Sequence, residues 1–197
     1  RKMGIRDKQS PDRSKVRKMT IGRQTLSYTG GEDELKGYMA YDDKSGSPMP
    51  GVIVVHEWWG LDDYIRTRTD KLAELGYAAL AIDMYGNGAT ADSPDEAGAM
   101  MNAVLGNMKI GTSRLRTAHE GLCAQPMVDE KRTAAIGYCF GGAMVLHMAR
   151  IGMPRKAVVS FHGALGSFHV PTPGEIKTRI MVCHGAKDSL VPENDIE

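Results

Sequence analysis

One cysteine of this sequence lies in a pattern that can make it a nucleophile. Residues 137–141 read Gly-Tyr-Cys-Phe-Gly, after the apolar run 133–138 and before a segment with helical periodicity. A residue at the tip of such a tight strand-to-helix turn is strained and exposed, and glycines two positions away avoid clashes. The start of the following helix favours an anion. We therefore predict that Cys139 is a nucleophile with a lowered pKa, whereas Cys123 and Cys183 are structural.

Acyl transfer by a cysteine also needs donors that stabilise the negative oxygen of the tetrahedral intermediate. One donor in this kind of turn is the backbone N–H that follows the nucleophile, which here belongs to Phe140. The second donor comes from the loop after an earlier strand. The loop Glu57-Trp58-Trp59 follows the apolar run 51–56, so the Trp58 N–H is our candidate.

The acid of a catalytic triad should follow the nucleophile in sequence, at the end of a later strand. Asp188 fits, because it lies in a glycine-containing loop after the apolar run 180–183, whereas Asp83 ends a strand before the nucleophile. No histidine follows Asp188, and we keep His162, at a strand end, as a candidate substitute base. Four other histidines end strands or fall inside helices, and we expect them to be structural: His56, His119, His147 and His184.

Short apolar runs separated by helical segments must position these side chains. Such runs indicate strands buried on both faces, and helical stretches near residues 62–75, 93–108, 112–122 and 142–151 separate most of them. This alternation predicts an α/β fold with a mostly parallel sheet, right-handed crossovers and helices on both faces. The expected buried strands are 51–56, 77–82, 133–138, 157–161 and 180–183, and the alternating segments 24–28 and 36–41 predict a preceding hairpin.

Composition and charge restrict the class of protein. The chain has 197 residues and a net charge of +1, but residues 1–18 carry eight basic and two acidic side chains. We therefore expect a basic, extended or disordered tail over residues 1–19 and one mildly acidic domain over residues 20–197. An acidic body argues against nucleic-acid binding. Three cysteines imply no disulfide framework, and no apolar stretch is long enough to span a membrane.

Together these motifs resemble the dienelactone hydrolases (carboxymethylenebutenolidases), which have the α/β-hydrolase fold. The resemblance covers roughly residues 20–197 and rests on four segments that occur in the same order. They are His-Glu-Trp-Trp-Gly at 56–60, Leu-Gly-Tyr at 75–77 with Asp-Met-Tyr at 83–85, Gly-Tyr-Cys-Phe-Gly-Gly at 137–142, and His-Gly-Ala-Lys-Asp at 184–188.

The resemblance implies roles for particular residues. It implies Cys139 as nucleophile, Asp188 as triad acid and Glu57 as a carboxylate that helps to form the thiolate when substrate binds. It also implies the backbone N–H groups of Trp58 and Phe140 as oxyanion donors. From the residues alone, a carboxylate in a partly dry crevice can exchange a proton with a thiol, which agrees with the role of Glu57.

Two departures from the family pattern affect the expected site. The triad histidine of the family follows the acid at a distance that would place it beyond Glu197, so we expect the domain to be truncated at its C-terminal end. Family members that cleave the dienelactone typically carry an arginine just after the segment that corresponds to 83–85. Here Gly86 and Asn87 follow Tyr85, so binding of a carboxylated lactone is in doubt.

These observations predict a hydrolase that cleaves a small-molecule ester or lactone through an acyl-thiol intermediate. We expect Trp59, Tyr85 and His162 to line the substrate pocket, and we expect no metal and no cofactor, since no His-Glu-x-x-His spacing exists. The alternatives are a general carboxylesterase of the same fold and a non-catalytic module that has lost its triad histidine. We expect a monomer or dimer in the cytoplasm, while export stays open because the chain begins at Arg1.

Overall fold

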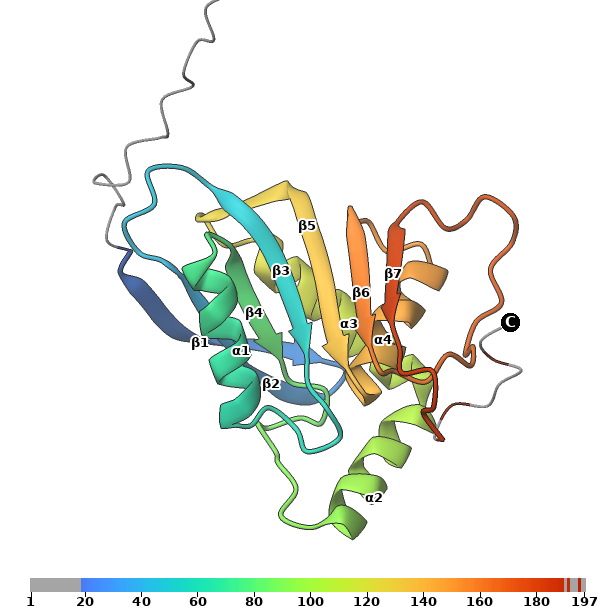
Figure 1. The fold of residues 1–197 in the computed structure, drawn as a ribbon. Helices are drawn as coiled ribbons and strands as arrows, with labels where there is room; N and C mark the ends of the chain where they lie inside the picture. The colour runs from blue at the N-terminus through green and yellow to red at the C-terminus, as the bar shows by residue number, and fades with distance from the viewer. Residues whose placement is uncertain (1–18, 190, 192–194, 196–197) are drawn as a thin grey trace, which may run out of the picture.

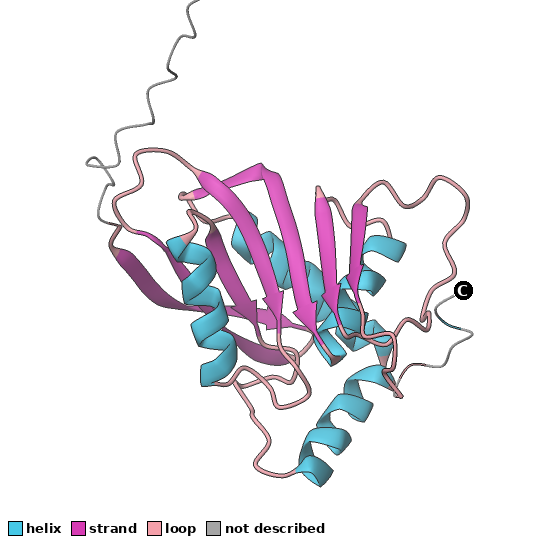
Figure 2. Cartoon of the chain, viewed as in Figure 1, coloured by secondary structure: helices cyan, strands magenta, loops and turns pink. Residues whose placement is uncertain are grey.

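The computed structural model describes residues 19–189, 191 and 195 of the chain. The predicted basic tail therefore falls, except for its last residue, outside the described residues. The described part forms one sheet with helices on both of its faces (Figures 1 and 2). None of its helices is long and apolar enough to cross a membrane.

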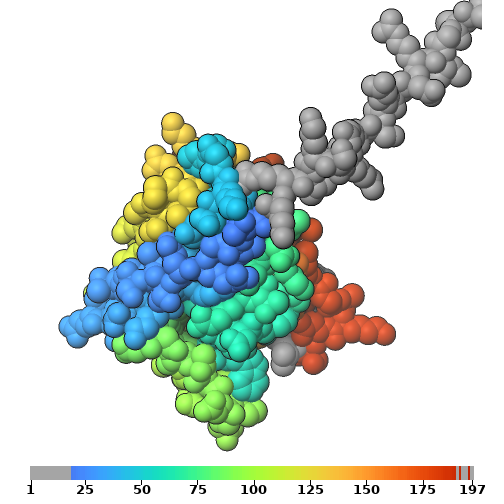
Figure 3. Space-filling model, turned by 90° about the vertical axis from the view of Figure 1, so that its left-hand side faces the viewer, coloured from blue at the N-terminus to red at the C-terminus, as the bar shows by residue number. Residues whose placement is uncertain are grey.

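Seven strands form the sheet, in the order β1-β2-β4-β3-β5-β6-β7. The strands from β3 onward pair in parallel, whereas the hairpin β1–β2 joins the edge of β4 in antiparallel orientation. Figure 3 shows this hairpin (blue) lying across one side of the molecule beside α1. The strands are β1 Ile21–Gly30, β2 Asp33–Asp42, β3 Met49–Val55, β4 Ala78–Ile82, β5 Val128–Tyr138, β6 Ala157–Phe161 and β7 Arg179–Cys183.

Three of the four described helices cover the sheet, with α1 on one face and α3 and α4 on the other, whereas α2 packs against α3 beyond the ends of the strands (Figure 1). Asp62 caps the first helix by accepting a hydrogen bond from the Ile65 N–H at 3.0 Å, and Ser93 caps the second helix in the same way. The helices are α1 Asp63–Glu74, α2 Pro94–Leu105, α3 Met108–Cys123 and α4 Phe140–Arg150.

The predicted elements are confirmed, with differences at their ends. Helix α3 begins four residues before the predicted start at Thr112, because the Asn107 side chain accepts a hydrogen bond from the Ile110 N–H and caps it there. Helix α4 begins at Phe140 rather than at Gly142, because the turn at Cys139 passes directly into the helix. The predicted α/β-hydrolase fold class is therefore confirmed by the order and direction of the strands.

Successive side chains of the central strands point to opposite faces of the sheet and pack in two apolar clusters. On β3, Ile53 and Val55 belong to the larger core cluster, and Val54 belongs to a smaller cluster beneath α1. The edge strand β7 differs, because the side chains of Ile180, Met181 and Val182 are 42–58% exposed. The centre of the sheet thus holds the most rigid framework for any group placed at its ends.

Candidate active site

The loops that follow the parallel strands meet at one edge of the sheet. The strands β3 to β7 point the same way in Figure 1, toward the edge beside α2. Glu57 follows β3, Cys139 follows β5, His162 follows β6 and Asp188 lies in the loop after β7. This is the edge at which open parallel sheets bind their ligands.

The turn at Cys139 has the strained geometry that the sequence predicts. The backbone of Cys139 has φ 52° and ψ −116°, and its N–H donates to the Phe161 carbonyl at 3.0 Å. A Cβ atom at Gly137 would lie 2.0 Å from the Gly141 carbonyl oxygen, and one at Gly141 would lie 2.2 Å from the Val55 carbonyl oxygen. Both glycines are therefore required by close backbone contacts.

The electrostatic setting of Cys139 differs from the prediction. Burial raises the pKa of the Cys139 thiol, the charges of Glu57 and Asp188 raise it further, and only the Phe140 N–H opposes them. The expectation of a lowered pKa was therefore wrong. The helix start does supply an N–H to the sulfur, but partial burial and two carboxylates outweigh it.

Glu57 lies beside a histidine, and its charge acts on the Cys139 thiol. Its carboxylate is 3.5 Å from Nε2 of His162, and the side chains of Glu57 and His162 are 27% and 48% exposed. The backbone of His162 has φ 43°, and its N–H donates to the Cys183 carbonyl at 2.8 Å. The loops after β3 and β6 thus bring an acid and a base together beside Cys139.

Two side chains, Tyr85 and His56, contact backbone carbonyls of the loop that carries Trp58. The Tyr85 hydroxyl donates to the Trp58 carbonyl at 2.7 Å, and the Tyr85 ring stacks on Phe140. His56 is fully buried, its Nδ1 contacts the Glu57 carbonyl, and its Nε2 accepts the Met84 N–H at 3.2 Å. Burial lowers the pKa of His56, which favours the neutral ring that can make both bonds. His56 is structural, as predicted.

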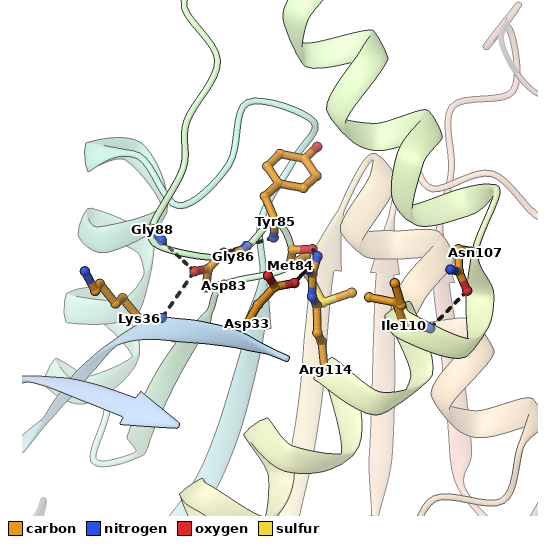
Figure 4. Close-up of polar contacts among 10 residues, drawn as sticks. All are labelled: Asp33, Lys36, Asp83, Met84, Tyr85, Gly86, Gly88, Asn107, Ile110 and Arg114. Atoms are coloured by element: carbon orange, nitrogen blue, oxygen red, sulfur yellow. Dashed lines mark hydrogen bonds and ion pairs between the residues drawn. The ribbon is translucent and has the colours of Figure 1, made fainter. Parts of the chain in front are cut away.

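A buried carboxylate organises the neighbouring loop (Figure 4). Asp83 accepts backbone N–H bonds at 2.7–3.2 Å from four residues: Lys36, Tyr85, Gly86 and Gly88. Its acceptor capacity is used within the loop, which supports the choice of Asp188 rather than Asp83 as a triad acid.

The sequence reasoning missed Arg114, which braces the same loop. Nη1 of Arg114 donates to the Met84 carbonyl at 2.6 Å, and Nη2 pairs with Asp33 (Figure 4). The sequence did contain a signal for this role, because Arg114 lies on the same buried side of α3 as Leu115 and Ala118.

An apolar cavity of about 390 Å³ opens beside Cys139. Of the three predicted pocket residues, His162 lines it, whereas Tyr85 and Trp59 are not among the described residues that line it. Tyr85 lies beneath the Trp58 loop, and the Trp59 ring contacts the Trp58 ring edge-on at 5.2 Å. The lining residues are Trp58, Met101, Leu105, Cys139, Phe140, Ala143, His162, Ala164, Phe168 and Val191.

The remaining titratable groups lie around or away from this cavity. His184 Nε2 is 3.8 Å from the Asp188 carboxylate. His119 and His147 lie on helices, and His147 Nε2 pairs with the Thr112 hydroxyl at 2.9 Å. Within the described part of the chain, no group of three or more His, Cys, Asp or Glu side chains could hold a metal ion.

Known proteins are similar to this chain in sequence and in fold. A putative carboxymethylenebutenolidase of Aquifex aeolicus is 32% identical over 83% of this chain and 71% of its own length, and the protein usf of Aquifex pyrophilus is 33% identical over the same shares. The solved structure named m3DLH has a TM-score of 0.83 at 39% identity, over 89% of this chain and 73% of that one.

A second solved structure, a dienelactone hydrolase-like promiscuous phosphotriesterase from metagenomic libraries, has a TM-score of 0.81. It is 36% identical, over 89% of this chain and 73% of its own. The profile of the dienelactone hydrolase family matches residues 35–197. Sequence, fold and the arrangement of loops agree, and such membership supports a hydrolase that acts on esters or lactones. The chain belongs to the dienelactone hydrolase family.

Proposed function

We propose that this protein hydrolyses small, uncharged esters or lactones with Cys139 as the nucleophile. The observation that carries the proposal is the place of Cys139: a strained turn at the carboxyl end of a central strand, on the wall of an apolar cavity. The same cavity is lined by Trp58 and Phe140, whose backbone N–H groups are our candidates for oxyanion donors.

In the first half of the reaction the thiol is acylated. The raised pKa means that the resting group is a thiol, so its proton must leave when substrate binds. We assign that proton to the Glu57 carboxylate, whose charge already acts on Cys139. The sulfur then bonds to the carbonyl carbon, the bond to the leaving oxygen breaks, and that oxygen takes up the proton held by Glu57, which gives an alcohol and restores the carboxylate.

In the second half water hydrolyses the thioester. Water adds to the acyl carbon, the carbon–sulfur bond breaks, and the products are a carboxylic acid and the free thiol. We assign activation of the water to a histidine oriented by Asp188, as the family resemblance implies. No histidine follows Asp188 in residues 1–197, so this assignment rests on the resemblance alone.

The chemistry of the cavity supports an uncharged substrate. No lysine or arginine of the described part of the chain lines it, and its walls are chiefly aromatic and aliphatic. Arg68 is close enough to feel the charge of Glu57, but its Nη2 donates to the Tyr64 hydroxyl. An anionic group in this cavity would lose its hydration and face the Glu57 carboxylate, which is unfavourable.

The test is capture of the acyl-enzyme. The protein is mixed with p-nitrophenyl butyrate, quenched in acid and examined by intact-mass and peptide mass spectrometry. We expect one butyryl group on Cys139, release of p-nitrophenol, no adduct in Cys139→Ala, and an unchanged adduct in the matched control Cys123→Ala. Release of p-nitrophenol at the wild-type rate by Cys139→Ala would refute the nucleophile, and no release by the wild type would favour a non-catalytic module.

A further inference from the structure

A second cavity lies at the opposite end of the sheet from Cys139. Its volume is about 340 Å³, and it lies where β5 begins and just before β6, whereas Cys139 and His162 follow the far ends of these two strands. Its described lining residues are Glu130, Lys131, Thr133, Pro154, Arg155 and Lys156. Three of these six side chains are cations, and one is an acid.

Arg155 is the unusual member of this set. The residue is only 7% exposed, yet its buried Nε and Nη1 atoms have no hydrogen-bond partner. Its Nη2 contacts the Met153 sulfur at 3.7 Å, which is a weak acceptor. No carboxylate of the described residues forms an ion pair with it. A buried guanidinium in this state is costly unless an anion accompanies it.

The charge of Arg155 cannot be removed by losing a proton near neutral pH. Burial lowers the pKa of Arg155 to about 10, so the group stays a cation in the cell. Its charge acts on two neighbours: it adds to the lowering of the pKa of His119, and it opposes the rise that burial and Glu130 cause in the pKa of Cys123. An anion is therefore the remaining means of balancing this charge.

The cavity has the features that such an anion needs. The side chains of Lys131 and Lys156 are exposed at its rim, and neither forms an ion pair with a described residue. Glu130 is the one acidic side chain among the described lining residues, and three cations outnumber it; Asp129 is paired with Arg132 at 2.6 Å and does not line the cavity. A planar guanidinium with two flexible ammonium groups suits the oxygens of a phosphate group.

We propose that this cavity binds a small phosphate, either the free ion or a phosphate monoester, with Arg155 at its base and Lys131 and Lys156 at its rim. The site is separate from the hydrolase chemistry and does not depend on it. Occupancy would stabilise the fold, because a ligand that binds only the native state adds to the free energy of unfolding.

The test measures thermal unfolding against phosphate concentration, with sodium chloride as a control of equal ionic strength. We expect a saturable rise of the unfolding temperature with inorganic phosphate and none with chloride. The double variant Lys131→Gln/Lys156→Gln keeps the buried arginine and changes only exposed side chains, and it should need at least about tenfold more phosphate. The matched control Lys71→Gln/Lys109→Gln, which removes two exposed lysines elsewhere, should respond as the wild type does.

Two further arms complete the design. Glycerol phosphate is compared with inorganic phosphate, and tighter binding of either supports the site and identifies its ligand class. Arg155→Gln, if it folds, should show no saturable response. The proposal is overturned if phosphate acts no better than chloride, or if the Lys131/Lys156 double variant responds like the wild type.

Discussion

The two ends of the sheet hold cavities of similar volume and opposite chemistry. At the carboxyl ends, a thiol faces apolar walls and two carboxylates act on it. Near the amino ends, a buried guanidinium lies beside two lysines. Both groups are partly or wholly removed from water, but they can respond in different ways. The thiol stays neutral by keeping its proton, whereas the guanidinium keeps its charge.

The difference is the reason why we propose a different kind of ligand for each end of the sheet. A group that can become neutral is suited to react with an uncharged substrate, because no counter-ion must be displaced first. A group that cannot become neutral near pH 7 calls for a charged ligand. The predictions below test each end of this comparison, from the largest expected effect to the smallest.

The largest effect should come from the backbone contact at the catalytic end. Gly141→Ala would place a Cβ atom 2.2 Å from the Val55 carbonyl oxygen, and the rigid centre of the sheet cannot move away. We expect a loss of more than about 4 kcal/mol in the free energy of unfolding, measured in urea, or no folded protein. The control Gly185→Ala meets no atom within 4 Å and should change stability by less than about 0.5 kcal/mol. A Gly141→Ala protein of normal stability would contradict the described contact.

The next effect concerns the charge of the substrate. The neutral p-nitrophenyl butyrate should have a kcat/KM at least about 100-fold above that of mono-p-nitrophenyl succinate, because desolvating the succinate carboxylate beside Glu57 costs a few kcal/mol. Ala164→Lys adds a cation to the cavity wall and should narrow this ratio. Equal values for the two esters in the wild type would refute the preference for uncharged substrates while leaving Cys139 as nucleophile.

A smaller effect should follow loss of one hydrogen bond to the loop that carries Trp58, our proposed oxyanion donor. Tyr85→Phe removes the donor to the Trp58 carbonyl, so we expect kcat to fall about tenfold with KM nearly unchanged. The control Tyr77→Phe changes a tyrosine outside this contact and should keep both constants. A drop in thermal stability without any change in kcat would show that Tyr85 only supports the fold.

The smallest expected effect is a change in the pKa of His119, which the charge of Arg155 lowers. Burial, together with the charge of Arg155, lowers the pKa of His119 to about 4. Phosphate bound at Arg155 would offset that positive charge, so the pKa of His119 should rise, by about half a unit in an NMR titration. His147 is the internal control, because burial, His169, Arg150 and Arg116 set its low pKa and Arg155 does not. Equal shifts of both histidines would indicate a general salt effect.

Much of the fold could be predicted because its signals are local. The apolar runs 51–56 and 133–138 and the glycines around Cys139 mark strands and a turn without reference to distant residues. The direction of the Cys139 pKa could not be predicted in this way. It depends on burial and on Glu57 and Asp188, which lie far from it in sequence and near it only after folding.

The same distinction explains the site residues that the sequence did not reveal. Arg114 reaches Met84 and Asp33, which are 30 and 81 residues away in the chain. Arg155 follows a proline in a short connection, where an arginine normally points into solvent. Only the folded structure, in which Arg155 is 7% exposed and its Nη2 contacts the Met153 sulfur, shows that its guanidinium is enclosed.

The backbone contact between Gly141 and the end of β3 also has a consequence for motion. The nucleophile turn and the segment Val55–His56 are in van der Waals contact through main-chain atoms, so neither can shift without the other. We therefore expect the turn at Cys139 and the end of β3 to move together when substrate binds. We expect the motion that admits a ligand to occur in the outer walls of the cavity. These walls are formed by Met101 and Leu105 on α2 and by the irregular segment that contains Ala164 and Phe168. Flexibility and chemistry are thus divided between different parts of the same cavity.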